Sequence, residues 1–454
     1  MFDPLEFINR HIIFPIYFWK NGDKRLKRLQ ELEEQQYLSP ELLAKLQLEK
    51  LQYIIRYAYL HTAYYRRIMD ERGLKPEDIR CLSDIEKLPI LTKSIIQQHS
   101  EELRSDQYEE SELIQDASGG STGEPTVFYK DYARHNLRRA DQLRHDRWSG
   151  WNIGKRSALI WGANRDLKSF QSWREFIITR YIARIWELDA FELTEKKMSE
   201  FVSILERVKP VMILGYANAL GQFSRYVLKN YPEHTIKLKG IISSAETLTP
   251  ENRASIEKAF SCSVYNRYGS REVGLIASEC KQHQGLHINA DNILLEIVEG
   301  NHSIERGKTG NIVVTDFSNK GMPLIRYQLG DRGALAVESC RCAINLPLLE
   351  RIEGRSSDFI LNKSGKLIHG EYFTHLFYGL QEIKKFQLIQ HSLDTLELKL
   401  VAIENDSINQ ALKNIKDKIR KIMEDDVDID VSFLTDIAPS PSGKFLFTLS
   451  KIHS

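Results

Sequence analysis

The sequence predicts an α/β protein: a large N-terminal domain of mainly parallel sheets flanked by helices, with a β-rich subdomain, and a small α+β C-terminal domain. Three observations lead to this prediction. Short apolar runs alternate with helical segments from about residue 110, a β-rich stretch follows over about 285–350, and strand and helix patterns close the chain. The 454 residues suffice for more than one core, and we expect domains at 1–354 and 355–454.

The segment 1–105 reads as a mostly helical lead-in to the first domain. RLKRLQELEEQQ and ELLAKLQLEKLQYIIRYAYLHT carry apolar residues at spacings of three and four, which is typical of helices. IIFPIYFW, near the start, is aromatic but short, and it contains Pro15. We expect this stretch to pack against the body of the protein rather than against lipid.

Buried strands alternate with helices in the next part of the chain, at SALIWG, VMILGY, GIISSAE and SVYNRYG. In a parallel sheet, ligands bind beyond the carboxyl ends of the strands. The positions of interest are therefore those that end or follow these strands: Gly162 and Ala163, Gly215 and Tyr216, Ser244 to Glu246, and Tyr268 to Glu272.

The overall charge balance excludes some partners. With 63 Lys plus Arg against 62 Asp plus Glu, nothing favours nucleic acid or an anionic membrane as the main partner. No run approaches the roughly 20 apolar residues of a transmembrane segment, and the N-terminus does not read as a secretory signal. Five scattered cysteines agree with a reducing compartment, so we expect a cytoplasmic protein.

The stretch SGGSTGEPT, residues 118–126, combines glycines with hydroxyl side chains. Glycine lets a ligand approach the backbone closely, and hydroxyl and amide groups can bind phosphate. The stretch departs from the usual G-x-x-x-x-G-K-[ST] motif, because Glu124 stands after the last glycine. Taken alone, it is as compatible with a flexible loop between two strands as with a phosphate site.

Four further stretches follow in a fixed order: YGSREVG (268–274), RYQLGDRG (326–333), EGRSSD (353–358) and SPSGK (440–444). Together with the glycine-rich stretch they resemble the adenylate-forming superfamily of acyl-CoA synthetases, most closely its phenylacetate-CoA ligase-like branch, which includes capsule-biosynthesis ligases. The resemblance covers about residues 40–454. It implies an AMP-forming ligase that joins a carboxylate to the α-phosphate of ATP, releases pyrophosphate and passes the acyl group to an acceptor.

The resemblance also implies roles for individual residues in binding ATP. The β- and γ-phosphates would lie on the glycine-rich loop, at Ser118, Gly119, Gly120, Ser121, Thr122 and Gly123. Adenine would contact Tyr268, with Gly269 and Ser270 in the same motif, and the segment Ser244, Ala245 and Glu246. The ribose hydroxyls would bind Asp331, with Arg355 near the ribose or a phosphate.

The catalytic residues implied by the resemblance are Glu272, Arg271 and Lys444. Glu272 matches the ligand of Mg²⁺, and Arg271 stands where the family has a threonine, so the α-phosphate contact would come from a charged donor instead. Lys444 matches the lysine that bridges the carboxylate, the α-phosphate and the ribose during adenylation. Asp358 would be the hinge about which the small domain swings between the two half-reactions.

A metal site is predicted outside these motifs. Cys280, His287, Cys340 and Cys342 together supply three thiolates and an imidazole, which is one structural zinc set. His283 competes with His287 for the fourth position. Ordinary cytosolic thiols and histidines are the alternative.

Two groups of residues have less specific readings. In ARHNLRRADQLRHDRW (133–148), the pairs Arg134 and Arg138, and Arg144 and Arg147, would each share a helix face. They could meet phosphates of CoA or of a nucleotide sugar, but we expect a solvated face. Candidates for the acid-binding pocket are Trp161, Tyr216, Asn218 and Ala219.

The acceptor is left open between CoA and an amine or nucleotide sugar, as in surface polysaccharide assembly. The alternative function is a degenerate nucleotide-binding member of the family, or a scaffold in a polysaccharide complex. The joint presence of Lys444, Asp331 and Glu272 argues against this alternative. A homodimer is also left open.

Overall fold

The structure is a computed structural model that describes residues 3–118, 126–161, 173–190, 193–355, 359–364, 367–377, 380, 382–424, 427–438 and 447–452. The predicted site residues Gly119, Gly120, Ser121, Thr122, Gly123 and Lys444, and the predicted hinge Asp358, lie outside these ranges. The chain forms two compact units. Of the described residues, the first unit comprises 3–118, 126–329 and 333–351, and the second comprises 330–332 and those from Ile352 onward.

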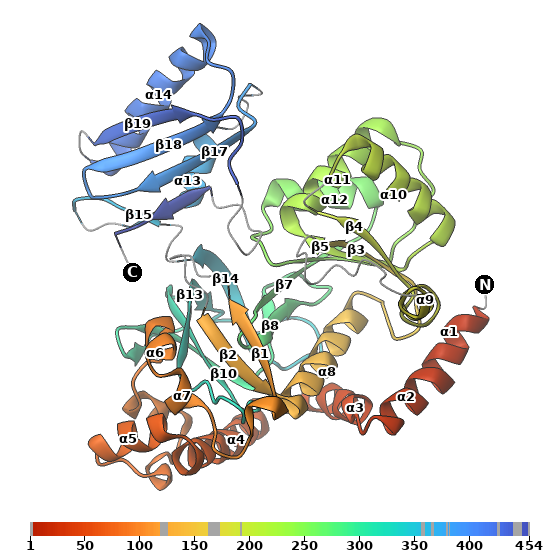
Figure 1. Cartoon of the computed structure of the whole chain (residues 1–454), viewed down its shortest axis with the longest axis vertical. Coiled ribbons are helices and arrows are strands. Elements are labelled where there is room, and N and C mark those ends of the chain that lie inside the picture. Colours follow the sequence, from red (N-terminus) through yellow and green to blue (C-terminus); the bar gives the residue numbers. More distant parts are fainter. Residues whose placement is uncertain are drawn as a thin grey trace. The chain divides into compact units, whose positions relative to one another are not determined.

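The first unit begins with helices, drawn in red and orange in Figure 1. They are α1 (Pro4–Ile8), α2 (Phe14–Lys20), α3 (Arg25–Gln35), α4 (Pro40–His61), α5 (Ala63–Glu71), α6 (Lys93–Gln98) and α7 (Ser100–Leu103). The longest, α4, starts at the N-cap Ser39 with Pro40 in its first turn, a typical helix start. Its buried residues Leu43, Gln47, Leu51, Ile54, Ile55 and Ala58 recur at spacings of three and four, which puts them on one face.

A sheet of 12 strands forms the centre of the first unit, in the order β11-β10-β12-β13-β14-β9-β8-β7-β6-β5-β3-β4. Its parallel part consists of β3 (Ser157–Trp161), β4 (Ile185–Asp189), β5 (Met212–Tyr216), β6 (Gly240–Ser244) and β7 (Val264–Ser270). The remaining strands are β8 (Gly274–Glu279), β9 (Leu286–Ile288), β10 (Ile293–Glu299), β11 (His302–Ser303), β12 (Gly310–Asp316), β13 (Tyr327–Leu335) and β14 (Leu348–Arg355). The hairpin of β1 (Leu113–Ser118) and β2 (Thr126–Asp131) forms a separate two-stranded sheet.

The parallel strands are covered by α10 (Glu195–Val208), α11 (Ala217–Asn230) and α12 (Pro250–Phe260) (Figure 1). Apolar side chains of these strands and helices form one buried cluster, with Phe201, Phe223 and Phe260 among its members. The other helices of this unit are α8 (Tyr132–Trp148) and α9 (Trp173–Ile177). The alternation of buried strands with amphipathic helices produces the parallel sheet that the sequence predicts.

The second unit has its own sheet and core. The sheet order is β19-β18-β17-β20, formed by β17 (Lys385–Gln390), β18 (Thr395–Val401), β19 (Asp428–Phe433) and β20 (Thr448–Ser450). The amphipathic helix α14 (Asp406–Met423) buries Ile408, Leu412, Ile415, Ile419 and Met423 in a core shared with these strands. The smaller elements are β15 (Phe359–Leu361), β16 (Leu367–His369) and α13 (Gly370–Leu376).

The predicted α/β fold class is thus confirmed, with one refinement: the parallel strands and the β-rich strands share one hydrogen-bonded sheet. The domain boundary at 354/355 and the mobility of the small domain stay predictions. The expected packing of IIFPIYFW is wrong for most of its large side chains, since Ile12, Ile16, Tyr17 and Trp19 are exposed and only Phe18 is buried. Within the described ranges, no helix is long and apolar enough to cross a membrane.

Candidate functional site

The carboxyl ends of three parallel strands bring several predicted residues to one edge of the sheet. Tyr216 at the end of β5 is in register with Ser244 at the end of β6, and Ser244 is in register with Arg267 of β7. Tyr268 follows Arg267 in the same strand. Trp161 ends β3, and its ring centroid lies 4.3 Å from that of Tyr216. The order of the strands therefore gathers the predicted adenine and acid-pocket residues at the edge where ligands bind in such sheets.

The segment after β6 is held in an unusual conformation. Ala245 has a φ of 68°, in the left-handed region that non-glycine residues seldom adopt. A carboxylate oxygen of Glu246 accepts a hydrogen bond of 2.9 Å from the backbone N–H of Asn218, in the first turn of α11. The carboxylate thereby satisfies a free donor at the start of that helix. This contact fixes Ser244, Ala245 and Glu246 beside Asn218.

The turn between β7 and β8 contains the predicted residues Arg271 and Glu272. Ser270 Oγ accepts a hydrogen bond of 3.1 Å from the backbone N–H of Val273, which closes the turn. Gly274 then has a φ of 100°, and an added Cβ there would lie 3.0 Å from Nε of Arg138. The backbone conformation favours glycine at this position, and a larger residue would also crowd the Arg138 side chain.

Glu272 is buried in this turn and is ionised. Burial alone would raise its pKa, but the positive charge of Lys93 and hydrogen bonds from Tyr327 and Ser270 outweigh burial and hold the pKa below its ordinary value. The Tyr327 hydroxyl donates to Oε1 of Glu272 over 3.1 Å, and Lys93 opens helix α6. A buried, ionised carboxylate of this kind has the chemistry of a ligand for Mg²⁺.

The hairpin of β1 and β2 positions the ends of the glycine-rich stretch. Ser118, the last residue of β1, pairs in register with Thr126, the first of β2. At the base of the hairpin, Lys130 donates to Oδ2 of Asp116 over 3.0 Å and to the backbone carbonyl oxygen of Arg271 over 2.7 Å. The Arg271 guanidinium lies 3.7 Å from Oδ1 of the same Asp116. These contacts bring the glycine-rich hairpin and the turn after β7 together.

Several described cations gather at this junction. Burial lowers the pKa of Lys130 to about 8, and the nearby Arg138 adds to the effect. Burial likewise lowers the pKa of Arg138 to about 10, with Arg134 and Arg139 contributing repulsion. Asp116 is the carboxylate that pairs with both Lys130 and Arg271. An anion placed here would relieve the repulsion between Lys130, Arg138 and Arg271, so the junction can bind a phosphate chain.

Sequence reasoning missed Lys130 and Asp116 as parts of this site. Each is a charged residue just outside the glycine-rich stretch, on opposite strands of the hairpin. The sequence could have indicated these two residues, because the apolar and charged pattern on either side of that stretch predicts two strands that pair. The pattern does not indicate that Arg271, far along the chain, would join them.

The expectation of a solvated arginine face on 133–148 is wrong for α8. Arg134 is buried, and its Nε donates to Asp316 Oδ2 over 2.6 Å. Arg144 is fully buried and paired with Asp291. Helix α8 packs on α3 and on β8. The carboxylates that pair with these arginines are Asp316 at the end of β12, Asp291 between β9 and β10, and Asp141 of α8 itself. Arg147 lies at the margin of this region, with its Nη1 2.6 Å from Glu33.

Two predicted nucleotide residues are located by their backbone positions. Asp331 lies in β13, half-buried, directly after Gly330, which has a φ of 84°. Arg355 is the last residue of β14. Their roles stay predictions.

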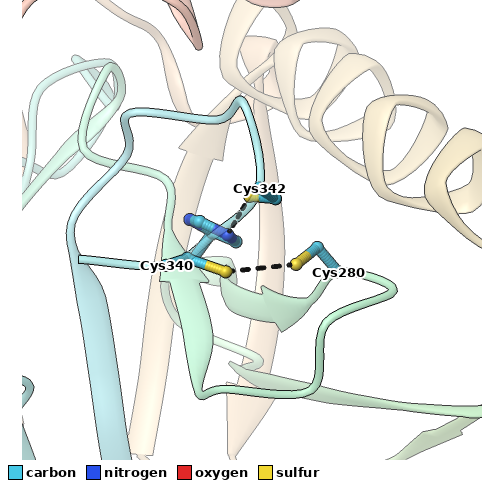
Figure 2. A group of neighbouring side chains, drawn as sticks. Cys280, Cys340 and Cys342 are labelled. Carbon is cyan, nitrogen blue, oxygen red and sulfur yellow. Dashed lines mark hydrogen bonds between the residues drawn. The ribbon is translucent and has the colours of Figure 1, made fainter. Parts of the chain in front are cut away.

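The four predicted metal ligands lie together at the end of β8 (Figure 2). One potential ligand atom from each of Cys280, His287, Cys340 and Cys342 lies within 4.8 Å of all the others. The Sγ atoms of Cys280 and Cys340 are 3.7 Å apart, and Sγ of Cys342 lies 3.3 Å from Nε2 of His287. Three thiols and one imidazole at such distances fit a tetrahedral zinc ion.

His287, not His283, belongs to this cluster. Nδ1 of His287 donates to the carbonyl oxygen of Leu346 over 2.9 Å. Nε2 therefore carries no proton, and its lone pair faces Sγ of Cys342. His283 is turned elsewhere, with its Nδ1 3.1 Å from the Glu279 carboxylate. The order of ligands in the sequence did not decide between the two histidines, because both follow Cys280 within a few residues.

Known proteins resemble this chain over most of its length. The chain is 24% identical to the protein CapK of Staphylococcus aureus over 446 residues, which cover 96% of this chain and 93% of CapK. It is 25% identical to a phenylacetate-coenzyme A ligase of Thermus thermophilus, over 82% of this chain and 84% of that protein. A family model described as the CapK C-terminal domain matches residues 360–451.

The fold is also found among solved structures. A crystal structure of 2-hydroxyisobutyryl-CoA ligase in the postadenylation state superposes with a TM-score of 0.70, at 18% identity, over 92% of each chain. The sequence similarity to CapK extends over almost the whole chain. Over most of its length the chain is thus similar in sequence to CapK and to phenylacetate-coenzyme A ligases, and it has the fold of an adenylate-forming acid–CoA ligase.

Proposed function

We propose that the protein activates a carboxylic acid with ATP, as an acyl-adenylate, and then transfers the acyl group to coenzyme A. The observation that carries this proposal is the junction of the glycine-rich hairpin with the turn after β7. There, Lys130 and Arg271 both pair with the Asp116 carboxylate, Arg138 lies nearby, and Glu272, whose pKa is below its ordinary value, follows Arg271.

The phosphates of ATP are assigned to this junction. Backbone N–H and hydroxyl groups of Ser118 to Gly123 would hold the β- and γ-phosphates, and Lys130 and Arg138 would neutralise them from the base of the hairpin. Arg271 would donate to the α-phosphate, where charge develops as the acid attacks. Glu272 would hold Mg²⁺, which supplies further charge neutralisation when bound.

The nucleoside is assigned to the neighbouring edge of the sheet. Tyr268 would stack on adenine, with Gly269 and Ser270 beside it, and Ser244, Ala245 and Glu246 would line the opposite side. Asp331 would accept hydrogen bonds from both ribose hydroxyls, with Arg355 near the ribose. The acid would lie at Trp161, Tyr216, Asn218 and Ala219, where two aromatic rings are in contact.

Lys444 is assigned to the first half-reaction only. A lysine on a small domain that moves about Asp358 can stabilise the adenylation transition state and then withdraw. This assignment depends on a domain boundary near 354/355 and on a mobile small domain.

The acceptor is assigned as coenzyme A because the phenylacetate-coenzyme A ligase of Thermus thermophilus and 2-hydroxyisobutyryl-CoA ligase, which resemble this chain, are CoA ligases. Similarity to CapK over 96% of this chain favours a second candidate, in which an amine or nucleotide sugar in polysaccharide assembly accepts the acyl group. A degenerate or scaffolding role is disfavoured by the ionised Glu272 beside the cationic junction. A cytoplasmic location and a homodimer stay predictions.

Pyrophosphate exchange across a panel of aromatic and short aliphatic acids tests the proposal. We expect exchange that depends on one class of acid, and AMP formation that accelerates when CoA is added. Acceleration by amines or nucleotide sugars instead of CoA would assign the second candidate. Absence of exchange with every acid, in a protein that still binds ATP, would support the degenerate alternative.

We also propose that Cys280, His287, Cys340 and Cys342 hold one zinc ion. Four protein ligands leave no open position, so the ion would stabilise the fold and take no part in the reaction. The carbonyl oxygen of Leu346 would orient the His287 ring as its outer partner.

A further inference from the structure

The N-terminal helical segment presents apolar side chains to solvent. α1, the π-helical turn Asn9–Ile13 and α2 form one continuous helix over residues 4–20. Ile8, Ile12, Ile16 and Trp19 follow one another at spacings of four and three, so they share a face, and they are 38%, 47%, 57% and 82% exposed. Single exposed apolar residues are common on protein surfaces, but a contiguous set marks an interaction surface.

The helix is fixed to the body of the protein through other side chains. Asn9 is buried, and its amide donates to the carbonyl oxygens of Tyr181 and Ile182 over 2.7 and 3.1 Å. At the start of the helix, Arg184 donates to the Asp3 carboxylate over 2.7 Å. The helix is therefore anchored through Asn9 and Asp3, while Ile8, Ile12, Ile16 and Trp19 stay exposed.

The neighbouring π-helical segment Ile178–Ala183, which Asn9 contacts, also exposes apolar side chains. Ile178 and Tyr181 of that segment are exposed. The backbone carbonyl oxygen of Tyr181 accepts the hydrogen bond from Asn9. We call the set Ile8, Ile12, Ile16, Trp19, Ile178 and Tyr181 the N-terminal apolar face. It combines aliphatic residues with the two aromatic types that favour the boundary between apolar and aqueous phases.

The exposed charges of this region are positive. Among the described residues up to 28, those that are both charged at neutral pH and exposed are Arg10, Lys20, Lys24 and Lys27. The acidic residues are half-buried, and Asp3 and Asp23 are paired with arginines. A second copy of the chain on a twofold axis would bring these lysines toward one another, whereas anionic headgroups would complement them.

We propose that the N-terminal apolar face docks on the surface of an anionic lipid bilayer. The helix would lie in the plane of the interface, with Ile8, Ile12 and Ile16 at the boundary of headgroups and acyl chains. Lys20 and Lys24 would lie at the level of the lipid phosphates. The enzyme would thus act as a peripheral membrane protein although its total charge is close to balanced.

Vesicle flotation of the full-length protein tests this proposal. The probes are vesicles of phosphatidylcholine alone and of equal parts phosphatidylcholine and phosphatidylglycerol. We expect flotation with the anionic vesicles, weaker flotation with phosphatidylcholine alone, and a decrease with added salt. Tryptophan fluorescence should shift to shorter wavelength on binding, and Trp19→Phe should remove most of that shift.

Variants test whether vesicle binding depends on the N-terminal apolar face or on exposed apolar residues in general. Ile12→Glu with Ile16→Glu should lower the partition coefficient at least about tenfold. The matched control is Leu42→Glu with Leu60→Glu, because both leucines are exposed on the different helix α4. That control should bind as the wild type does. Trp19→Ser, at the most exposed of these positions, keeps the test available if the double variant does not fold.

Three outcomes would overturn the proposal. The first is no flotation with anionic vesicles. The second is that the double variant Ile12→Glu with Ile16→Glu floats as well as the wild type. The third is a dimer that does not bind vesicles and that the same double variant dissociates, as measured by mass photometry. The last outcome would assign the face to a second copy of the chain.

Discussion

The Lys130 ammonium group lies 2.7 Å from the backbone carbonyl oxygen of Arg271, a residue 141 positions further along the chain. This hydrogen bond joins the strand that leaves the glycine-rich stretch to the turn that contains Glu272. The same ammonium group is 3.0 Å from Asp116 on the partner strand of the hairpin. Lys130 thus links the three segments to which we assign the phosphates and the Mg²⁺ ligand.

Replacing Lys130 by alanine should weaken ATP binding. A charge-assisted hydrogen bond to a partly buried phosphate contributes roughly 1.5–3 kcal/mol, so the dissociation constant for ATP should rise about 10-fold to 100-fold. Calorimetric titration measures the change, with Lys237→Ala as the control at an exposed lysine. An unchanged affinity would place the phosphates away from the base of the hairpin.

The affinity for ATP should also depend on pH through Lys130. Because burial lowers the pKa of this lysine to about 8, the free protein loses its charge as the pH rises through that value. ATP binds better to the charged form, so affinity should fall between about pH 7 and pH 9, with proton uptake on binding. Lys130→Arg keeps its charge over this range and should lack the fall. Equal pH profiles for the two proteins would contradict the assignment.

Glu272→Gln should impair adenylation through the metal. The Glu272 pKa is held below its ordinary value, so the residue carries a full charge at neutral pH, and the amide removes that charge with little change in size. We expect pyrophosphate exchange to fall about 10²-fold to 10³-fold, with partial recovery at high Mg²⁺ concentration. Glu251→Gln, at an exposed position of α12, is the control. Loss without any response to Mg²⁺ would point to a structural role.

The zinc proposal predicts a difference between two nearby histidines. Washed protein should contain about one zinc ion per chain by elemental analysis, and His287→Gln should lose it while His283→Gln retains it. Cys340→Ser with Cys342→Ser should also lose zinc and unfold at a lower temperature, whereas Cys262→Ser should keep the metal. Zinc retained by the Cys340 and Cys342 variant would exclude this site.

Lys444→Ala should separate the two half-reactions. Removal of a charge that acts only in adenylation should slow pyrophosphate exchange about 10²-fold to 10³-fold, while a synthetic acyl-adenylate is still passed to CoA. Both rates are measured on the same preparation. Equal losses in the two assays would mean that the lysine supports binding or folding in general, and near-normal exchange would remove it from the adenylation site.

The sequence predicted the parallel sheet and the residues at its edge for a physical reason. Buried strands are continuous apolar runs, and their carboxyl ends must meet at one edge, so the proximity of Tyr216 and Ser244 follows from local pattern plus topology. The grouping of Cys280, His287, Cys340 and Cys342 was predictable for a different reason. Cysteines and histidines are sparse in this chain, so such a set seldom arises by chance.

The surroundings of the charged residues were not predictable from local pattern. A helix repeat shows that Arg134 and Arg138 share a face of α8, but it does not show that Asp316 covers one of them. The partnership of Lys130 with Arg271 likewise depends on how the hairpin packs against the main sheet. For the N-terminal helix, the apolar pattern predicted a buried face, and the pattern cannot distinguish the interior of the protein from another apolar phase.

The short strand β9 connects the two parts of the large sheet in the first unit. It has three residues and pairs with β8 on one side and β14 on the other, and it joins the parallel strands to β14, β13, β12 and β10. His287 is its central residue, and Cys280, Cys340 and Cys342 gather beside it. The ladder between β9 and β14 has two residue pairs, so a zinc ion bound by this cluster would reinforce a short connection in the sheet. With zinc bound, we expect amide protons on the two sides of β9 to exchange together, and without zinc we expect them to exchange more independently of one another.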